Sequence, residues 1–207
     1  SVSTDTRKLE PGALFFALKG PNFNANQLAA QALEAGAACA VIDDPAFDSD
    51  ERTLLVDDAL TALQDLARFH RNQLKIPVFG LTGSNGKTTT KELLNAVLSQ
   101  KFVTFATPGN YNNHIGVPLT VLAIGEGTEL AIVEMGANHQ GEIQLLSSIC
   151  RPTHGLITNI GKAHLEGFGG VAGVRVGKGE LFDFLAQTDG TVFVNTLEPT
   201  PVSYTHL

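Results

Sequence analysis

The chain has 207 residues, of which 43% are hydrophobic and 17% charged, so it can form one large or two small globular domains. Its formal net charge of −7 argues against a nucleic-acid-binding protein, because phosphate-backbone binding needs clustered Lys and Arg. The sequence has no apolar run long enough to span a membrane and no signal-like start, so we expect a cytoplasmic protein without membrane insertion. Cys39 and Cys150 lie far apart in apolar segments, which favours buried free thiols of a reducing compartment over a disulfide.

The first 75 residues alternate short apolar runs with helical patterns. The predicted strands cover residues 12–18, 38–43 and 53–56, and the predicted helices cover 27–35 and a longer segment that begins after Asp57 or Asp58. The polar turn 19–24 supplies an N-cap for the first of these helices. This alternation predicts a small α/β domain over residues 1–75.

The stretch 77–91 carries the most specific signal in the chain. An apolar run with strand character over 78–81 meets a glycine-punctuated turn, and a helical pattern follows. Strand, glycine turn and helix form the layout of a phosphate-binding loop, in which backbone N–H groups and the helix start surround one anion. The general pattern has another glycine at the position of Leu81, so this loop is a shorter variant. A plain glycine-rich turn would leave the lysine and the hydroxyls unexplained, and we therefore predict nucleotide binding.

The residues predicted to bind the nucleotide are Gly83, Ser84, Asn85, Gly86, Lys87, Thr88 and Thr89. Lys87 can reach the terminal phosphates, and the Thr88 hydroxyl can bind Mg²⁺.

From residue 76 the alternation of strands and helices restarts. The predicted strands cover 78–82, 102–106, 130–135, 155–160 and 191–194, and the predicted helices cover 87–99, 141–150 and 171–187, with a loop between 106 and 130. Near-continuous apolar strands are typical of a parallel sheet covered on both faces, and ligands bind beyond the carboxyl ends of such strands. The predicted fold class is therefore α/β: a small N-terminal domain, followed by a P-loop parallel-sheet domain over 76–207.

Polar residues follow several of these strands. Glu134 closes the strand 130–135, where P-loop folds place a metal or water ligand, although a merely solvated carboxylate is an equal alternative. His164 follows the strand 155–160, and an isolated His is more often solvent-exposed or locally hydrogen-bonded than functional. The loop 107–116 carries three asparagines, and its simpler interpretation is a turn-rich connection. Lys178 lies inside the last helix, where a solvated helix face is the more common explanation.

Taken together, these segments resemble the Mur ligase family along the length of the chain. The matching motifs are Asp5-Thr6-Arg7, Ala17-Leu18-Lys19-Gly20 with Phe23, the phosphate-binding loop 82–90, Gly109 to Thr120, Val133 to Asn138, Asn159 to Gly169, and Lys178-Gly179-Glu180. The phosphate-loop variant marks the family broadly. The asparagine loop, the Glu-Met-Gly-Ala-Asn strand end and the segment 164–167 favour the branch that uses D-alanyl-D-alanine.

The resemblance implies an ATP-dependent amide ligase of peptidoglycan precursor synthesis. ATP would phosphorylate the terminal carboxylate of UDP-N-acetylmuramoyl-tripeptide, and the amine of D-alanyl-D-alanine would attack the acyl phosphate. The implied catalytic residues are Lys87, Lys178, Glu134 and His164. The implied Mg²⁺ ligands are Thr88, Glu134, His164 and a carbamylated Lys178. Nitrogen is an unusual ligand for Mg²⁺, which favours Thr88 and Glu134 over His164 as ligands.

The resemblance also implies a substrate site. Its residues for the UDP-sugar-peptide are Asp5, Thr6, Arg7, Lys19, Gly20, Phe23 and Asn24, while Asn112 and Asn113 would line the substrate side of the ATP site. The expected partners are these small molecules, with neither nucleic acid nor membrane, and a monomer is expected.

The family is longer than this chain and has a further C-terminal domain, so we expect a substrate domain with part of an ATPase domain that is inactive alone. Residues 201–207 depart from the family pattern, which suggests a truncated or chimeric reading frame. Three alternatives stay open. The first is a sibling Mur or folylpolyglutamate-type ligase. The second is a P-loop NTPase or phosphotransferase that makes no amide bond, and the third is a non-catalytic nucleotide-binding module.

Overall fold

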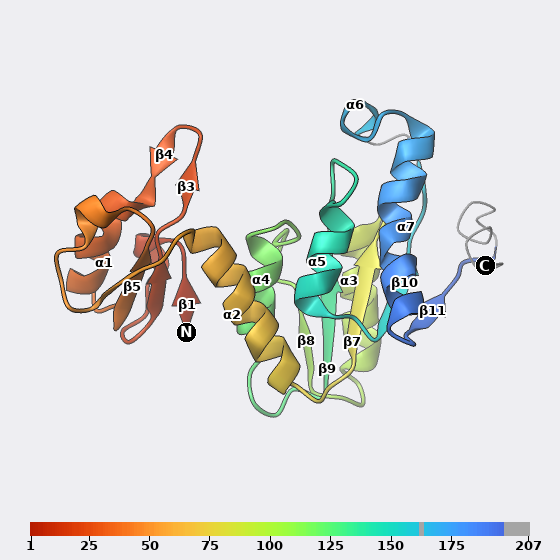
Figure 1. The fold of residues 1–207 in the computed structure, drawn as a ribbon. Coiled ribbons are helices and arrows are strands. Elements are labelled where there is room, and N and C mark those ends of the chain that lie inside the picture. The colour runs from red at the N-terminus through yellow and green to blue at the C-terminus, as the bar shows by residue number, and fades with distance from the viewer. Residues whose placement is uncertain (162–163, 197–207) are drawn as a thin grey trace. The chain divides into compact units, whose positions relative to one another are not determined.

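The computed structural model describes residues 1–161 and 164–196. The chain divides into two compact units, residues 1–66 and 67–207, and the division falls inside helix α2 (Ala59–Gln73) (Figure 1). Both units have α/β architecture, as predicted. The predicted domain boundary between residues 75 and 76 lies just beyond the end of α2 and stays a prediction. None of the described helices combines the length and apolar character that a membrane span requires.

The first unit is built on a parallel four-stranded sheet in the order β1-β2-β5-β6. Its strands are β1 (Val2–Ser3), β2 (Leu14–Phe16), β5 (Cys39–Ile42) and β6 (Thr53–Leu55). The antiparallel strands β3 (Lys19–Gly20) and β4 (Phe23–Asn24) form a separate hairpin. The helices are η1 (Thr6–Lys8), η2 (Ala25–Leu28), α1 (Ala29–Glu34) and η3 (Pro45–Phe47). The three predicted strands are present with shorter bounds, whereas the two-residue strands were too short to leave a pattern.

Apolar side chains from β2, β5 and α1 form the core of this unit. Alternate residues of each strand point to the same face, so Phe15 and Ala17 pack with Ala40 and Ile42. The helix predicted over 27–35 differs from the structure in its first turn. It begins as the 3-10 helix η2, because Asn24 accepts a hydrogen bond from the N–H of Asn26 at 3.0 Å.

The second unit contains a parallel five-stranded sheet in the order β11-β10-β7-β9-β8. Its strands are β7 (Val78–Thr82), β8 (Thr104–Ala106), β9 (Leu130–Glu134), β10 (His154–Ile157) and β11 (Thr191–Phe193). Each predicted strand of this domain is present. β7 pairs with both β9 and β10, so the loops that follow these three strands share one edge of the sheet.

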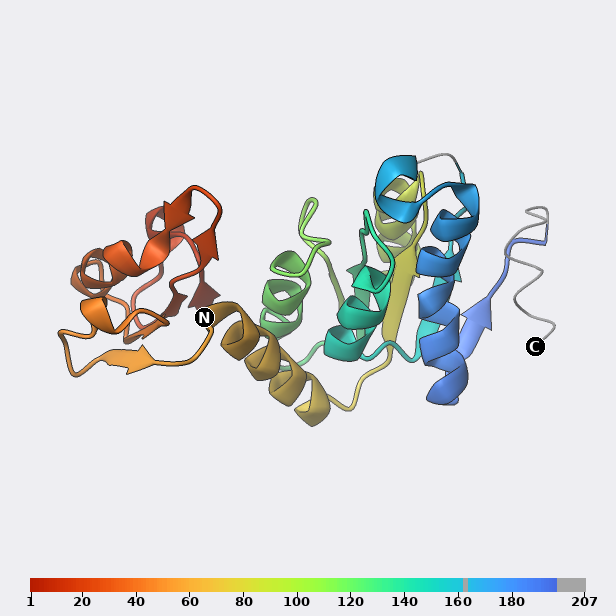
Figure 2. The same ribbon diagram turned by 45° about the horizontal axis from the view of Figure 1, so that its top comes forward.

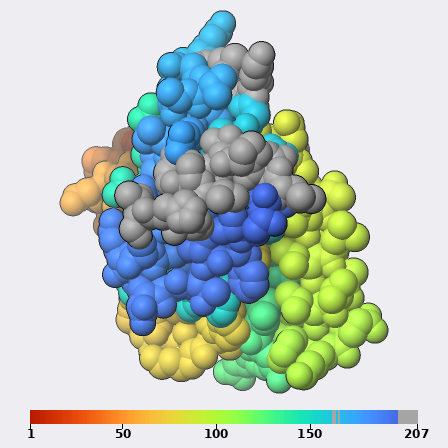
Figure 3. Space-filling model, turned by 90° about the vertical axis from the view of Figure 1, so that its right-hand side faces the viewer, coloured from red at the N-terminus to blue at the C-terminus, as the bar shows by residue number. Residues whose placement is uncertain are grey.

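Helices cover both faces of this sheet. They are α3 (Lys87–Leu98), α4 (Gly116–Leu122), α5 (Glu142–Cys150), α6 (Leu165–Phe168) and α7 (Val171–Gln187). The β7–β8 connection runs toward one edge of the sheet, and the connections through α4, α5 and α7 run toward the other. Right-handed crossovers therefore place α3 on one face and the other three on the opposite face (Figures 1 and 2). From the β11 edge, the α7 and α3 segments lie on opposite sides (Figure 3).

Helix α4 contradicts the loop predicted between residues 106 and 130. The side chain of Asn113 caps this helix by accepting hydrogen bonds from the N–H groups of Ile115 (3.1 Å) and Gly116 (2.8 Å). Pro118 lies in the first turn, where a missing N–H breaks no helical hydrogen bond. The glycine and asparagine residues that suggested a loop therefore form the approach to a helix.

Three further expectations differ from the structure or fall outside it. Strand β10 ends at Ile157 rather than at 160, because the next residues turn to bond the phosphate-binding loop. Both cysteines are free, as predicted, but Cys39 is half-buried while Cys150 is buried, and burial raises the pKa of the Cys150 thiol to about 12. Residues 201–207, which depart from the pattern of the Mur ligase family in sequence, lie outside the described residues.

Candidate active site

The phosphate-binding loop follows β7 and depends on two glycines. Gly83 has φ 145° and Gly86 has φ 75°, a region that favours glycine. A Cβ on Gly83 would overlap the Thr158 hydroxyl, so glycine also permits the close approach of the loop after β10. Helix α3 then begins at Lys87, and its first turn points free N–H groups toward the loop.

The loop after β10 holds the phosphate-binding loop through several hydrogen bonds. The N–H of Ser84 donates to the carbonyl of Asn159 (3.0 Å), and the N–H of Gly161 donates to the Ser84 hydroxyl (2.9 Å). The N–H of Asn85 donates to the side chain of Asn159 (3.1 Å), and the Thr158 hydroxyl donates to the Asn85 carbonyl (2.7 Å). The conformation of the loop is therefore set by the fold itself.

Lys87 folds back over this loop. Its Nζ donates to the carbonyl of Gly83 at 2.9 Å and to that of Ser84 at 3.5 Å. Burial lowers the pKa of Lys87, while the nearby charge of Glu134 acts in the opposite direction. The ammonium thus lies beside the N–H groups that would receive a phosphate.

Glu134 is the last residue of β9, and its side chain is 1% exposed. Its Oε1 accepts hydrogen bonds from Asn112 Nδ2 (2.8 Å) and from the Thr88 hydroxyl (3.3 Å). Its Oε2 is buried and, among the described residues, has no hydrogen-bond partner. A buried carboxylate oxygen without a partner is costly, so this atom has the character of a ligand for a cation. The solvated carboxylate that the sequence left open is excluded.

The residues at this point fit a magnesium ion. Mg²⁺ prefers oxygen ligands and keeps several waters or phosphate oxygens, so one carboxylate and one hydroxyl suffice from the protein. Glu134 Oε2 and the Thr88 hydroxyl supply such a pair. Within residues 1–161 and 164–196, no cluster of three or more His, Cys, Asp and Glu side chains could hold a metal ion.

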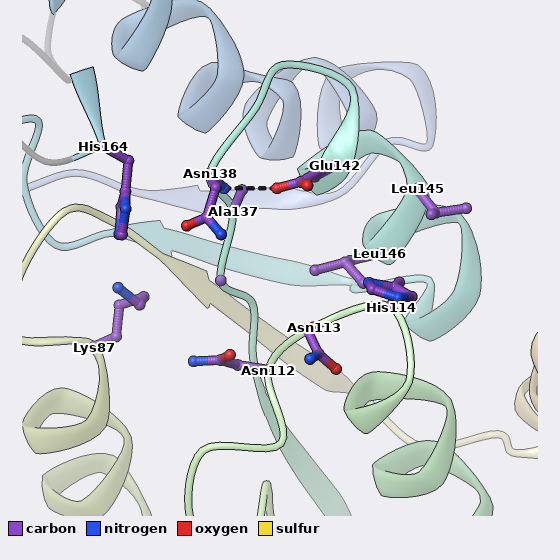
Figure 4. A pocket seen from close by; sticks show the side chains of 11 residues that line it. Lys87, Asn112, Asn113, His114, Ala137, Asn138, Glu142, Leu145, Leu146 and His164 are labelled. Carbon is purple, nitrogen blue, oxygen red and sulfur yellow. Dashed lines mark hydrogen bonds between the residues drawn. The ribbon is translucent and has the colours of Figure 1, made fainter. Parts of the chain in front are cut away.

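Two adjoining cavities lie at this edge of the sheet. The smaller, of about 320 Å³, is lined by residues 84–89 together with Asn112 and Glu134. The larger, of about 450 Å³, is lined by Lys87, Asn112, Asn113, His114, Gly136, Ala137, Asn138, Glu142, Leu145, Leu146 and His164 (Figure 4). They share Lys87 and Asn112. The predicted nucleotide site therefore opens into a second space, which combines amide, carboxylate and apolar groups.

His164 and Lys87 face each other across the larger cavity (Figure 4). His164 is exposed and has φ 53°, a left-handed conformation that turns the chain into α6. His164 thus lies at the edge of the sheet where the sequence predicted it. The two residues before it, 162 and 163, are not among the described residues.

Lys178 is 1% exposed, so the solvated helix face suggested by its position in α7 is wrong. Its Nζ donates to the carbonyl of Ala137 (3.0 Å), a residue of the cavity wall, and lies 5.1 Å from the centre of the Phe168 ring. Burial lowers its pKa to about 8, and the charge of Lys87 adds to this effect. Glu180, two residues further along α7, accepts hydrogen bonds from the N–H groups of Gly141 (2.5 Å) and Gln144 (2.9 Å).

The two predicted asparagines have different surroundings. Asn112 contacts Glu134 directly, and its carbonyl accepts the N–H of Gly136 at 2.7 Å. Asn113 lines the larger cavity, but its side-chain oxygen is used to cap α4. Thr89 is exposed on the first turn of α3 and lines the smaller cavity.

Lys91 is a site residue that the sequence analysis missed. It is 0% exposed, and its Nζ donates to the carbonyls of Thr107 (2.8 Å) and Gly109 (3.1 Å). The signal was present, because Lys91 occupies the same stripe of the helix as Leu94 and Leu98.

The predicted substrate residues of the first unit form two groups. Asp5 accepts two hydrogen bonds from the Arg7 guanidinium (2.9 and 2.8 Å), which together with the Arg7 backbone N–H lower its pKa to about 2, and Thr6 lies between them in η1. In the hairpin, Gly20 pairs with Phe23, whose side chain is 55% exposed. Lys19 forms an ion pair with Asp43 at 2.9 Å, and Asn24 bonds the buried Asn26.

Sequence and structure comparisons give a consistent result. Residues 81–203 match the model of the Mur ligase middle domain, and residues 1–71 match that of the Mur ligase family, catalytic domain. The chain is 45% identical over 195 residues to UDP-N-acetylmuramoyl-tripeptide–D-alanyl-D-alanine ligase of Bacillus subtilis, covering 93% of this chain and 43% of that protein. The enzyme of the same name from Escherichia coli is 47% identical, with 94% and 43% covered.

Solved structures agree with these sequence matches. The crystal structure of MurF from Acinetobacter baumannii superposes with a TM-score of 0.91 at 38% identity and covers 99% of this chain and 45% of its own. MurF ligase from Thermotoga maritima, solved in complex with ADP, superposes with a TM-score of 0.81 at 34% identity, with 88% and 43% covered. The chain thus spans less than half the length of the relatives it matches. On the match of both its units, the chain belongs to the Mur ligase family.

Proposed function

We propose that this chain is the nucleotide-binding part of an ATP-dependent amide ligase. The full protein would join D-alanyl-D-alanine to UDP-N-acetylmuramoyl-tripeptide in peptidoglycan synthesis, as the names of its relatives state for those enzymes. The observation that carries the proposal is the buried Oε2 of Glu134, which has no partner among the described residues, while Oε1 of the same carboxylate accepts from Thr88 at the start of the phosphate-loop helix. A Mg²⁺–nucleotide would satisfy this oxygen.

The proposed reaction has two steps. A carboxylate oxygen of the tripeptide attacks the γ-phosphorus of ATP, the bond to the bridging oxygen breaks, and ADP leaves. The amine of D-alanyl-D-alanine then attacks the acyl carbon, loses a proton, and displaces phosphate as the amide bond forms. Bound Mg²⁺ would neutralise charge on the phosphates.

The residues of this chain would bind and orient the reactants. Lys87 would exchange its bonds to the Gly83 and Ser84 carbonyls for the terminal phosphates, where its charge opposes the developing negative charge. Thr88 and Glu134 would hold the ion. The larger cavity beyond Lys87 would receive the carboxylate end of the tripeptide, beside Asn112 and His164.

For Lys178 we propose carbamylation. The lowered pKa increases the fraction of neutral amine, which can add CO₂ and release a proton as the new N–C bond forms. At present two ammonium groups, those of Lys178 and Lys87, repel each other. A carbamate would replace this repulsion by attraction and supply a further anionic oxygen for Mg²⁺.

For the first unit we propose that the Asp5–Arg7 pair and the hairpin residues Lys19, Gly20, Phe23 and Asn24 bind the UDP-sugar-peptide. An exposed aromatic ring and a lysine on the same two-stranded hairpin suit a ligand with a base and phosphates. Because the relatives are more than twice as long, we expect no amide formation by the 207-residue chain alone.

Calorimetry with ADP tests the nucleotide site in the chain as it stands. Wild-type protein is expected to bind ADP more tightly in the presence of Mg²⁺. Glu134→Gln removes the anionic ligand, so Mg²⁺ should no longer increase the affinity, whereas Lys87→Met should weaken binding with or without the metal. The controls are Glu126→Gln and Lys101→Met, at exposed positions. Equal behaviour of Glu134→Gln and wild type would contradict the proposal.

A further inference from the structure

Lys91 is a buried cation to which the proposed reaction assigns no role. Its ammonium uses all three donors, on the carbonyls of Thr107 and Gly109 and on Glu92 Oε1 at 3.0 Å. Burial of an ammonium group is unfavourable, and an apolar residue on the stripe of Leu94 and Leu98 would avoid that cost. The contacts of Lys91 with the carbonyls of Thr107 and Gly109 must therefore account for a lysine at this position.

Both carbonyls lead to Glu134. The hydroxyl of Thr107 accepts a hydrogen bond from the backbone N–H of Glu134 at 2.9 Å, so Thr107 fixes the end of β9. Gly109 begins the loop that carries Asn112, whose side chain donates to Glu134 Oε1 at 2.8 Å. The carbonyl of Asn112 also accepts the N–H of Gly136 at 2.7 Å. The Lys91 ammonium is therefore connected to Glu134 in two ways. One runs through Thr107 to the backbone N–H of Glu134, and the other runs through Gly109 and Asn112 to its carboxylate.

We propose that Lys91 is a positioning residue. It fastens the loop 107–112 to α3, and that loop holds Asn112 on one oxygen of Glu134, so that the other oxygen, Oε2, is presented to the metal–nucleotide. Lys87 and Lys91, one helical turn apart, then have separate tasks: the first contacts phosphate, and the second orients the group that binds the metal. The structural part concerns this chain alone, and the consequence for Mg²⁺ rests on the proposed function.

Amide hydrogen exchange of the ligand-free chain tests the structural part. In Lys91→Met the N–H groups of Asn112, Glu134 and Gly136 are expected to exchange about tenfold faster, as loss of a bond of roughly 1.4 kcal/mol implies. Ser84 and the first unit should keep their rates, and so should all amides of the control Lys101→Met. Unchanged rates at Gly136, or an equal increase throughout the sheet, would overturn the proposal. If Lys91→Met does not fold, Lys91→Gln, a shorter and uncharged but still polar side chain, gives the same test at the N–H groups of Asn112, Glu134 and Gly136.

Mg²⁺ affinity of the ADP complex tests the consequence. Lys91→Met is expected to weaken Mg²⁺ binding about tenfold, as changes behind a metal ligand commonly do, and to leave metal-free ADP binding unchanged. Combined with Asn112→Ala, its effect should be smaller than the sum of the two, because both act on Glu134. Full additivity, or an equal loss without metal, would overturn the role toward Mg²⁺. Failure of wild-type protein to bind ADP would refute the proposed function, while the exchange experiment would still decide the structural role.

Discussion

At the scale of residues, the site combines cations that are withdrawn from water with one buried anionic oxygen. Lys87, Lys91 and Lys178 each donate to backbone carbonyls. Carbonyl oxygens replace part of the lost hydration without cancelling the charge, so each ammonium group remains a source of positive potential. Positive potential suits a polyphosphate and an acyl phosphate, but burying the charges that produce it lowers the stability of the folded state.

Lys178 gives a prediction about pH. Burial lowers its pKa to about 8 in the folded chain from an ordinary value of 10.5, so between these pH values the unfolded chain binds a proton that the folded chain lacks. The free energy of unfolding of wild type, relative to that of Lys178→Met, should therefore rise from pH 8 to pH 10.5.

Urea unfolding at a series of pH values, in buffer depleted of CO₂, measures this difference. Lys101→Met, which removes an exposed lysine, is the matched control. A difference between wild type and Lys178→Met that does not change with pH would mean that this ammonium is not destabilised by burial.

At the scale of elements, α4 depends on one side chain for its start. Asn113→Ala removes the acceptor of two backbone N–H groups and should lower the free energy of unfolding by about 1 kcal/mol. Amide exchange at Ile115 and Gly116 should accelerate, and Asn113→Asp should restore protection. Asn110→Ala, at an exposed asparagine of the same loop, is the matched control. An equal cost for both alanine variants would contradict the capping role.

The helices and strands also differ in how well the sequence could predict them. The run 78–82 followed by the glycine turn and α3 agrees with the prediction, because strand period, glycine conformation and helix start all act locally. Helix α4 was missed since its cap residues are also typical of loops, and Pro118 conceals the helical period. Local patterns could not identify the partners of Lys91 and Lys178, because these partners are carbonyls contributed by distant loops.

At the scale of the molecule, the second unit begins before the predicted boundary at 75/76. Arg71 is 6% exposed and donates to the carbonyls of Cys150 (2.8 Å) and Arg151 (3.0 Å), and His70 Nε2 lies 3.1 Å from the carbonyl of Ile124. All of these residues belong to the second unit. The last turns of α2 thus complete the sheet domain that follows them.

This division predicts the behaviour of fragments. A fragment of residues 67–207 should unfold cooperatively, whereas one of 76–207 should be less stable by more than about 3 kcal/mol, because it loses charged hydrogen bonds and core side chains together. Thermal unfolding monitored by circular dichroism compares the two. Arg71→Met in the longer fragment separates the guanidinium from the rest of the segment. Equal stability of both fragments would support the boundary at 75/76.

The bonds between Ser84, Asn85 and residues 158–161 have a consequence for how the molecule would respond to a ligand. The conformational entropy of the phosphate-binding loop is lost during folding, so little of it remains to be lost on binding. The two loops also form one mechanical piece, since neither can shift without displacing the other. A phosphate that displaced the phosphate-binding loop would therefore also displace residues 158–161, which precede His164 in the chain. The strands of the sheet would not need to rearrange.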